Sequence, residues 1–144
     1  MKKQNGFSLI EILITLIIMS YGLLGVAGII VNSLKVSQSS YSRSQASLLA
    51  NDIIDRMRAN RVTAEKTPCP CPYDLALNGT PGGTGVSLSD LTEWQESLTS
   101  TLPSGTGSVA LNETTKKRTV TIQWDDSRAI RGSNSQNITI ETRL

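Results

Sequence analysis

The chain has 144 residues, which is enough for one domain and little more. Its formal net charge is +2, and Lys2 and Lys3 supply this excess, because the other 12 basic residues balance the 12 acidic ones. Such a balance argues against a strongly basic nucleic-acid-binding protein. The sequence has no histidine, the commonest general base and metal ligand, and only two cysteines.

The N-terminal segment predicts a membrane-spanning helix. Between Phe7 and Val31 the only charged residue is Glu11. A helix over this segment is about 37 Å long, whereas the hydrocarbon core of a bilayer is about 30 Å thick. Lys2 and Lys3 precede the apolar run, and this bias is expected to keep the N-terminus cytoplasmic.

Two simpler interpretations are a cleaved secretory signal and a plain single-pass anchor. A secretory signal has a shorter apolar stretch followed by a small-residue cleavage site, which is not the pattern here. A plain anchor leaves Glu11 unexplained, since a carboxylate in an apolar span costs about 2.5–3.5 kcal/mol. No basic residue lies between Lys3 and Lys35 to pair with it. Cleavage between Gly6 and Phe7 would create a cation about one helical turn away, which could neutralise Glu11 of a neighbouring subunit.

The residues from Gly6 to Glu11 read GFSLIE, after a short basic leader and before the apolar run. This pattern resembles the class III signal of type IV prepilins and pseudopilins. The resemblance implies a leader over residues 1–6, cleavage between Gly6 and Phe7 by prepilin peptidase, and N-methylation of Phe7. It also implies that Glu11 guides assembly with other minor and major pilins and with the inner-membrane assembly platform.

The span over residues 7–31 is expected to continue as an amphipathic helix over residues 32–66. No proline or glycine occurs from Lys35 to Lys66, and two apolar stripes recur at helical spacing. The stripes are Leu34, Tyr41 and Leu48, seven apart, and Ala46, Leu49, Ile53 and Met57, three or four apart. We expect them to face a sheet or other subunits. Thr67-Pro68 is expected to end the helix, because the residue before proline avoids the α region.

A charged segment from Asp52 to Asn60 lies near the end of this helix. Asp52 with Arg56, and Asp55 with Arg58, have helical ion-pair spacing, which is typical of a solvated face. The segment, DIIDRMRAN, also resembles the helix signature of PilV-type minor pilins. The similarity therefore extends from the N-terminus to about Asn60.

Residues 67–144 predict a small head. The expected elements are a stiff turn at residues 68–72, a short strand at 75–77, a glycine-rich loop at 78–85, a helix from Asp90 to Pro103, and strands at 109–111, 119–124 and 137–142. Trp94 and Trp124 are expected in the core. The resulting fold class is α+β, with the long helix packed on a small antiparallel sheet as in the type IV pilin fold.

Two weaker signals occur in the head. Cys69 and Cys71 are compatible with a strained local disulfide, with free thiols or with a link to another protein. The basic run from Lys116 to Arg118 predicts a solvated hairpin turn, and it has no interleaved aromatic residue that would favour DNA binding.

No set of nucleophile, base and oxyanion donors is evident, so the sequence predicts a non-enzymatic protein without cofactor or metal. The function implied by the resemblance is that of a minor pilin that helps to initiate or cap a type IV pilus. It would be anchored in the bacterial inner membrane with its head in the periplasm, and later reach the cell surface. The alternatives are a minor pseudopilin of a type II secretion system and a ligand-binding tip adhesin or DNA-uptake pilin.

Overall fold

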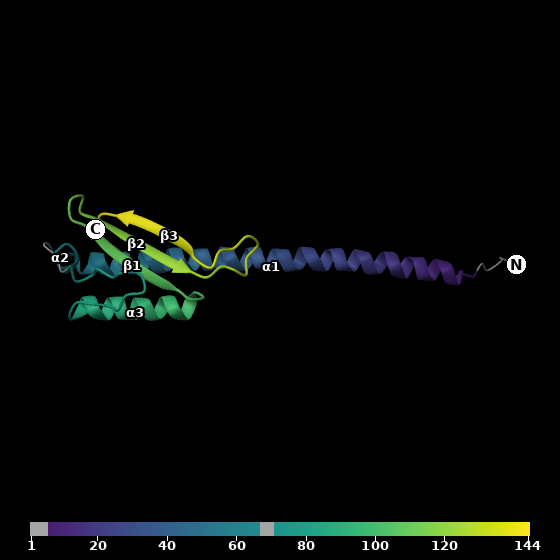
Figure 1. Ribbon diagram of the computed structural model, residues 1–144, viewed down its shortest axis with the longest axis horizontal. Coiled ribbons are helices and arrows are strands. Elements are labelled where there is room, and N and C mark those ends of the chain that lie inside the picture. Colours follow the sequence, from purple (N-terminus) through teal and green to yellow (C-terminus); the bar gives the residue numbers. More distant parts are fainter. Residues whose placement is uncertain (1–5, 67–70) are drawn as a thin grey trace.

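The computed structural model describes residues 6–66 and 71–144. The elements in chain order are α1 (Leu9–Ala59), α2 (Arg61–Ala64), α3 (Val86–Thr101), β1 (Thr106–Asn112), β2 (Lys117–Trp124) and β3 (Gln136–Thr142). The N-terminal half of α1 projects as a rod, and its C-terminal half is part of the head (Figure 1). This arrangement confirms the predicted α+β class and is consistent with the type IV pilin fold.

Helix α1 has 51 residues and is therefore about 77 Å long. Ser8 has an extended backbone, and its carbonyl accepts the first helical bonds, from the amides of Glu11 and Ile12. No proline interrupts the helix, and its apolar first half has the length that a bilayer requires. Sequence and local geometry thus agree on one continuous rod.

The predicted end of this helix is wrong by several residues. We expected an unbroken helix to Lys66, but α1 ends at Ala59 and Asn60 leaves the helical region, with φ −115° and ψ 45°. The short α2 follows immediately. The side-chain amide of Asn60 donates to the hydroxyl of Tyr73 at 3.2 Å, so a tertiary contact accompanies the break before any proline is reached.

The sheet is antiparallel, in the order β1-β2-β3. The three predicted strands are confirmed; each begins one to three residues earlier than predicted, and β1 also ends one residue later. A turn closed by the amide of Lys116, which donates to the carbonyl of Asn112 at 2.8 Å, joins β1 to β2. In place of the expected strand at residues 75–77, Leu75 alone forms a bridge with Val109.

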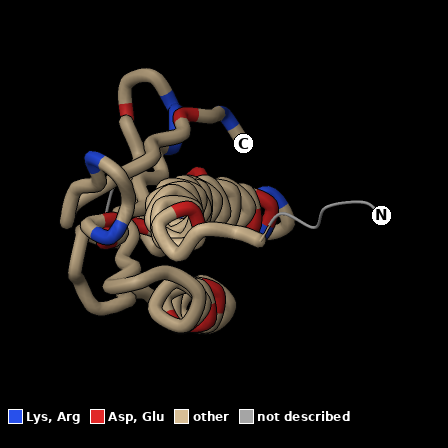
Figure 2. The backbone as a smooth tube through the Cα atoms, turned by 90° about the vertical axis from the view of Figure 1, so that its right-hand side faces the viewer, with Lys and Arg blue, Asp and Glu red and all other residues tan. Residues whose placement is uncertain are grey.

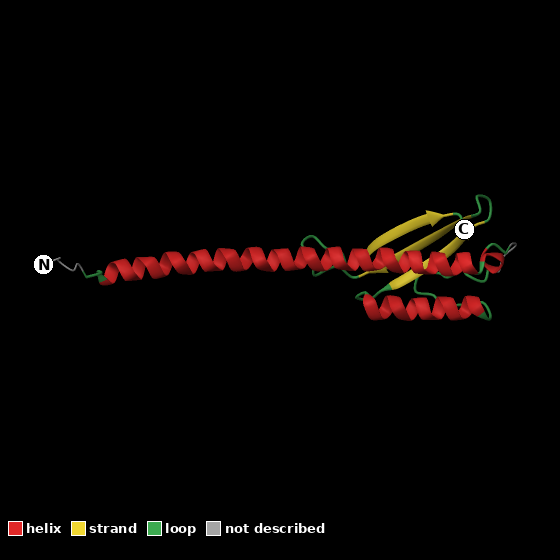
Figure 3. Ribbon diagram, turned by 180° about the vertical axis from the view of Figure 1, so that it is seen from behind, coloured by secondary structure: helices red, strands yellow, loops and turns green. Residues whose placement is uncertain are grey.

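The head has two layers, with α1 and α3 side by side and the sheet packed across them (Figures 2 and 3). Trp94 and Trp124 are buried, as predicted, and the Trp94 indole donates to the carbonyl of Leu49 at 2.8 Å. A Cβ at Gly107 would lie 2.4 Å from the Trp94 ring, so only glycine lets β1 approach α3 this closely. The core joins the α1 stripe of Ala46, Leu49, Ile53 and Met57 to α3 and to the sheet.

The start of α3 differs from the prediction. We expected it near Asp90, but it begins at Val86, after Gly85 with a φ of 63°. Asp90 and Glu93 resemble a capping pair in sequence, yet both carboxylates are used in tertiary contacts. Asp90 accepts a hydrogen bond from Tyr73, and Glu93 pairs with Arg56 at 2.8 Å. A glycine that can adopt positive φ therefore marks the true start.

Candidate functional site

The N-terminal end of α1 brings together the residues that the sequence singled out. Gly6 and Phe7 precede the helix and are exposed, and Glu11 is the acidic residue of its first turn. A negative charge at this position is favoured by the helix dipole. A recess of about 230 Å³ is lined by Phe7, Glu11, Ile12 and Thr15. Phe7 and Glu11 thus border one small concave surface.

The polar groups around this recess differ in how they are satisfied. Thr15 donates to the carbonyl of Ile12 at 2.8 Å, so its hydroxyl is satisfied within the helix. Within residues 6–66 and 71–144, the structure gives the Glu11 carboxylate no ion pair and no side-chain hydrogen bond. An unpaired carboxylate in an apolar setting favours a cation supplied from outside the chain.

The apolar half of α1 is not covered by the head. It contains an 18-residue window of mean hydropathy 2.3, none of which is buried. Phe7, for example, is 80% exposed. A helix that is apolar on every side needs a bilayer or other helices around it. The observed geometry is consistent with membrane anchoring.

The two apolar stripes on the second half of α1 have different surroundings. Ala46, Ile53 and Met57 are buried against the head, and Leu49 is partly buried. Leu34, Tyr41 and Leu48 remain exposed, at 65%, 57% and 63%. The stripe of Ala46, Leu49, Ile53 and Met57 therefore holds the head to the helix. The heptad-spaced set lies on a face that nothing in the described chain covers.

The charged segment from Asp52 to Asn60 is integrated into the head more than its sequence suggests. Both predicted ion pairs form, with Arg56 at 3.0 Å from Asp52 and Arg58 at 2.8 Å from Asp55. Arg56 also pairs with Glu93 of α3. The Glu93 hydrogen bond is the main cause of a raised Arg56 pKa, and in turn the pKa of Glu93 is lowered. Arg56 therefore links α1 to α3.

The prediction that residues 116–118 form a solvated basic turn is wrong for Arg118. Its side chain is fully buried, and its guanidinium donates to the Asp74 carboxylate and to the Ala64 carbonyl. Burial lowers the pKa of Arg118, and the Asp74 charge opposes that effect. Of the basic run, only the two lysines remain exposed. This leaves less positive charge for a nucleic acid than the sequence suggested.

The alternation of buried residues along β2 could have predicted that Arg118 is buried. Val120, Ile122 and Trp124 are buried at a period of two, and Arg118 continues the same face. Its partner Asp74 lies 44 residues earlier in the chain, so no local pattern connects the two. The Tyr73–Asp90 pair was missed for the same reason. Cys71 is disulfide-bonded, which excludes a free thiol there, while Cys69 lies outside the described residues.

Comparison with known proteins supports the interpretation of the N-terminus. Residues 1–27 match the family model described as the prokaryotic N-terminal methylation motif. Searches of curated proteins and of solved structures gave no significant match. The matched motif and the fold together support a type IV pilin-like protein. The class III signal implies processing by prepilin peptidase and assembly into a pilus or pseudopilus.

Proposed function

We propose that this type IV pilin-like chain is a minor pilin that enters a type IV pilus at low copy and helps to initiate or cap its assembly. In this proposal residues 1–6 are a cleaved leader, residues 7–31 span the inner membrane, and residues 67–144 form a periplasmic head on the helical segment 32–66. Its partners are prepilin peptidase, the other pilins and the inner-membrane assembly platform.

The observation that carries the proposal is Glu11, an unpaired carboxylate at the start of an uncovered apolar helix. Cleavage after Gly6 would expose the amine of Phe7, and Phe7 borders the same recess as Glu11. In a stack of subunits, each Phe7 amine could neutralise the Glu11 of its neighbour. The cost of about 2.5–3.5 kcal/mol for carrying the carboxylate in the bilayer would then be recovered on assembly.

The exposed heptad-spaced stripe supports the same proposal. Leu34, Tyr41 and Leu48 lie at one seven-residue spacing, opposite the core of the head. A spacing of seven suits contact with another long helix. The stripe would extend helix–helix packing from the membrane span to the level of the head.

The PilV-type resemblance is the basis for proposing a minor subunit, and the structure gives that segment a role within the chain as well. Arg56 joins α1 to α3, and Ile53, Ile54 and Met57 are in the core. A minor pseudopilin of a type II secretion system remains the second candidate, because its N-terminal motif would be the same. No contact among the described residues favours an adhesin or a DNA-uptake role over these.

The Glu11→Val variant tests the proposal. Removing the charge should leave membrane insertion unharmed or improved, because the span becomes more apolar. In a filament, however, the neighbour's Phe7 amine would lose its partner and remain buried, which costs several kcal/mol. We expect processed, membrane-located protein that is depleted from sheared pili and does not promote piliation.

Thr15→Val is the matched control. Thr15 lines the same recess, and its hydroxyl is bonded within the helix, so this change removes polarity without removing charge. The measurement is a pilus count and a blot of the sheared fraction in cells that express only the variant. Normal piliation and incorporation of Glu11→Val would contradict an assembly role for Glu11. Normal pili with impaired protein secretion would instead favour the pseudopilin candidate.

A further inference from the structure

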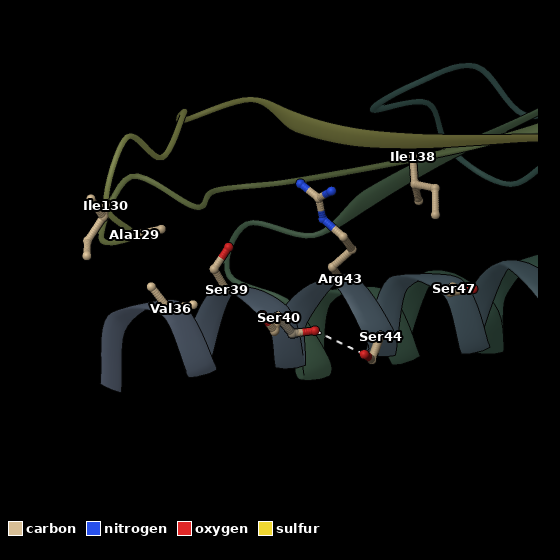
Figure 4. A pocket seen from close by; sticks show the side chains of 9 residues that line it. All are labelled: Val36, Ser39, Ser40, Arg43, Ser44, Ser47, Ala129, Ile130 and Ile138. Carbon is tan, nitrogen blue, oxygen red and sulfur yellow. Dashed lines mark hydrogen bonds between the residues drawn. The ribbon is translucent and has the colours of Figure 1, made fainter. Parts of the chain in front are cut away.

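The loop between β2 and β3, residues 125–135, is the part of the head that reaches furthest along α1 toward the N-terminus (Figures 1 and 3). The Ser39 hydroxyl donates to the Asp126 carboxylate at 2.6 Å and ties the loop to the helix. A groove of about 640 Å³ separates the two, lined by residues that include Val36, Arg43 and Ile130. Figure 4 shows Ile130 at the groove's N-terminal end, near Val36.

This position places the loop close to the end of the apolar span. Val36 lies five residues after Val31, which corresponds to about 7.5 Å along the helix. The headgroup region adds roughly 5–7 Å to each side of the hydrocarbon core. The loop tip beside Val36 would therefore lie at the outer boundary of the headgroups, and a long arginine side chain would reach the phosphates.

The loop has the chemistry of a membrane-surface contact. Its tip reads Arg128-Ala129-Ile130-Arg131, with both arginines exposed and Ile130 48% exposed. Among the described residues neither arginine has an ion pair, although the pKa of the Asp125 carboxyl is lowered by hydrogen bonding from Ser127 and, less strongly, by the charge of nearby Arg128. Lys35 is a third exposed cation, one turn before Ser39 on the same helical face.

The acidic residues of the loop are already bonded within the head. Asp126 accepts from Ser39, and Asp125 accepts from the amide of Ser127 at 2.8 Å. The backbone is fixed as well, because the amide of Ala129 donates to the carbonyl of Asp126 at 2.9 Å and that of Gly132 to Ala129 at 3.1 Å. A Cβ at Gly132 would lie 1.7 Å from the Asp126 carbonyl oxygen, so the turn requires glycine. The cations are therefore presented on a preformed turn.

We propose that the β2–β3 loop binds anionic phospholipid headgroups of the leaflet on the head's side, through Arg128 and Arg131, with Ile130 entering the interface. The inference rests on the membrane anchor of the proposed function. Phosphates complement the two exposed arginines, and the anchor holds them within reach. The contact would fix the tilt and rotation of the head over the bilayer before the subunit enters a filament.

Hydrogen exchange on the processed full-length chain in lipid nanodiscs tests this inference. Discs of phosphatidylcholine alone are compared with discs containing equal parts of phosphatidylglycerol. Exchange of the loop amides should be slower with the anionic lipid. Each cation near an anionic surface contributes about a fivefold factor, so Arg128→Gln/Arg131→Gln should lose about 25-fold in protection. High salt should abolish the difference, because the screening length falls to about 3 Å at 1 M.

Lys116→Gln/Lys117→Gln is the matched control. It removes the same charge from the hairpin at the opposite end of the head, and Lys116 and Arg131 share a positive φ, 55° and 62°. Protection that depends on phosphatidylglycerol and is lost only in the arginine variant would support the inference. Equal exchange in both discs, or equal loss in both variants, would overturn it. Exchange in β2 reports whether each variant is folded. Failure of the chain to enter discs at all would contradict the anchor itself, and the inference with it.

Discussion

The buried pair of Arg118 and Asp74 provides a quantitative test of the head's internal structure. Asp74→Ala would leave the Arg118 guanidinium buried with the Ala64 carbonyl but without its carboxylate. Breaking a buried ion pair in this way costs about 3–5 kcal/mol. The Asp74 side chain is 38% exposed, so water can partly replace it. We therefore expect a loss of about 2–3 kcal/mol in the free energy of unfolding.

Arg118→Met should be less harmful than Asp74→Ala. Methionine fills much of the same space and removes the buried charge, so no cation is left unpaired. The Ala64 carbonyl then loses its donor, at a cost of about 1–2 kcal/mol. Because the two residues interact, the double variant should be no less stable than Asp74→Ala alone. The change in unfolding free energy of the double variant should differ from the sum of the two single changes by more than about 1 kcal/mol.

The assay is urea unfolding of the detergent-solubilised chain, followed by the fluorescence of the buried Trp94 and Trp124. A loss of 2–3 kcal/mol should lower the midpoint by about 1–2 M. If Arg118→Met is as harmful as Asp74→Ala and the two effects are additive, the cost does not come from an unpaired cation. That result would refute the argument from buried charge.

Processing, independent folding of the head and pH dependence supply the other tests. Intact mass of the membrane-extracted protein should lack Met1 to Gly6 and include one added methyl group; mature protein that retains the leader would contradict cleavage. Removal of the first 30 residues should leave a soluble head that is folded by circular dichroism, because the buried α1 stripe stays with the sheet; aggregation would contradict the boundary. Burial, and then the bond to Asp90, raise the pKa of Tyr73 from 10.0 to about 12. Since the folded pKa is the higher one, this contribution to stability is complete below pH 10 and is lost as the pH rises toward 12. Between pH 10 and 12 the urea midpoint should fall by less in Tyr73→Phe than in the unchanged protein. An equal fall would contradict the assignment of this pH dependence to Tyr73.

The elements that the sequence could predict are those set by local periodicity. The long apolar run predicts the first half of α1, and alternation predicts β2 with Val120, Ile122 and Trp124 on its inner face. The same alternation places Arg118 on this face, but the predicted strand began at Thr119, one residue too late to include it. The sequence predicts a solvated arginine at this strand end, because its partner Asp74 is distant in the chain.

The features that could not be predicted depend on tertiary contacts. The break at Asn60 coincides with its bond to Tyr73, and the start of α3 depends on the backbone of Gly85 rather than on Asp90. Periodicity showed two stripes on α1, but it could not decide which one the head would cover. At the N-terminus, the sequence identified Gly6, Phe7 and Glu11, and their roles stay predictions.

The uncovered half of α1 also limits the route that a subunit of this shape can take. Its exposed large apolar residues between Phe7 and Val31 each gain about 1.5–3 kcal/mol on leaving water, so transferring them all into water would cost tens of kcal/mol. An intermediate dissolved in water is not thermodynamically accessible at such a cost. Any filament that contains this chain must therefore take it up directly from the lipid bilayer. On entry, the apolar side chains would leave contact with lipid acyl chains and pack against protein. Disassembly of the proposed filament would follow the same path in reverse, and the bilayer would then be the reservoir of subunits.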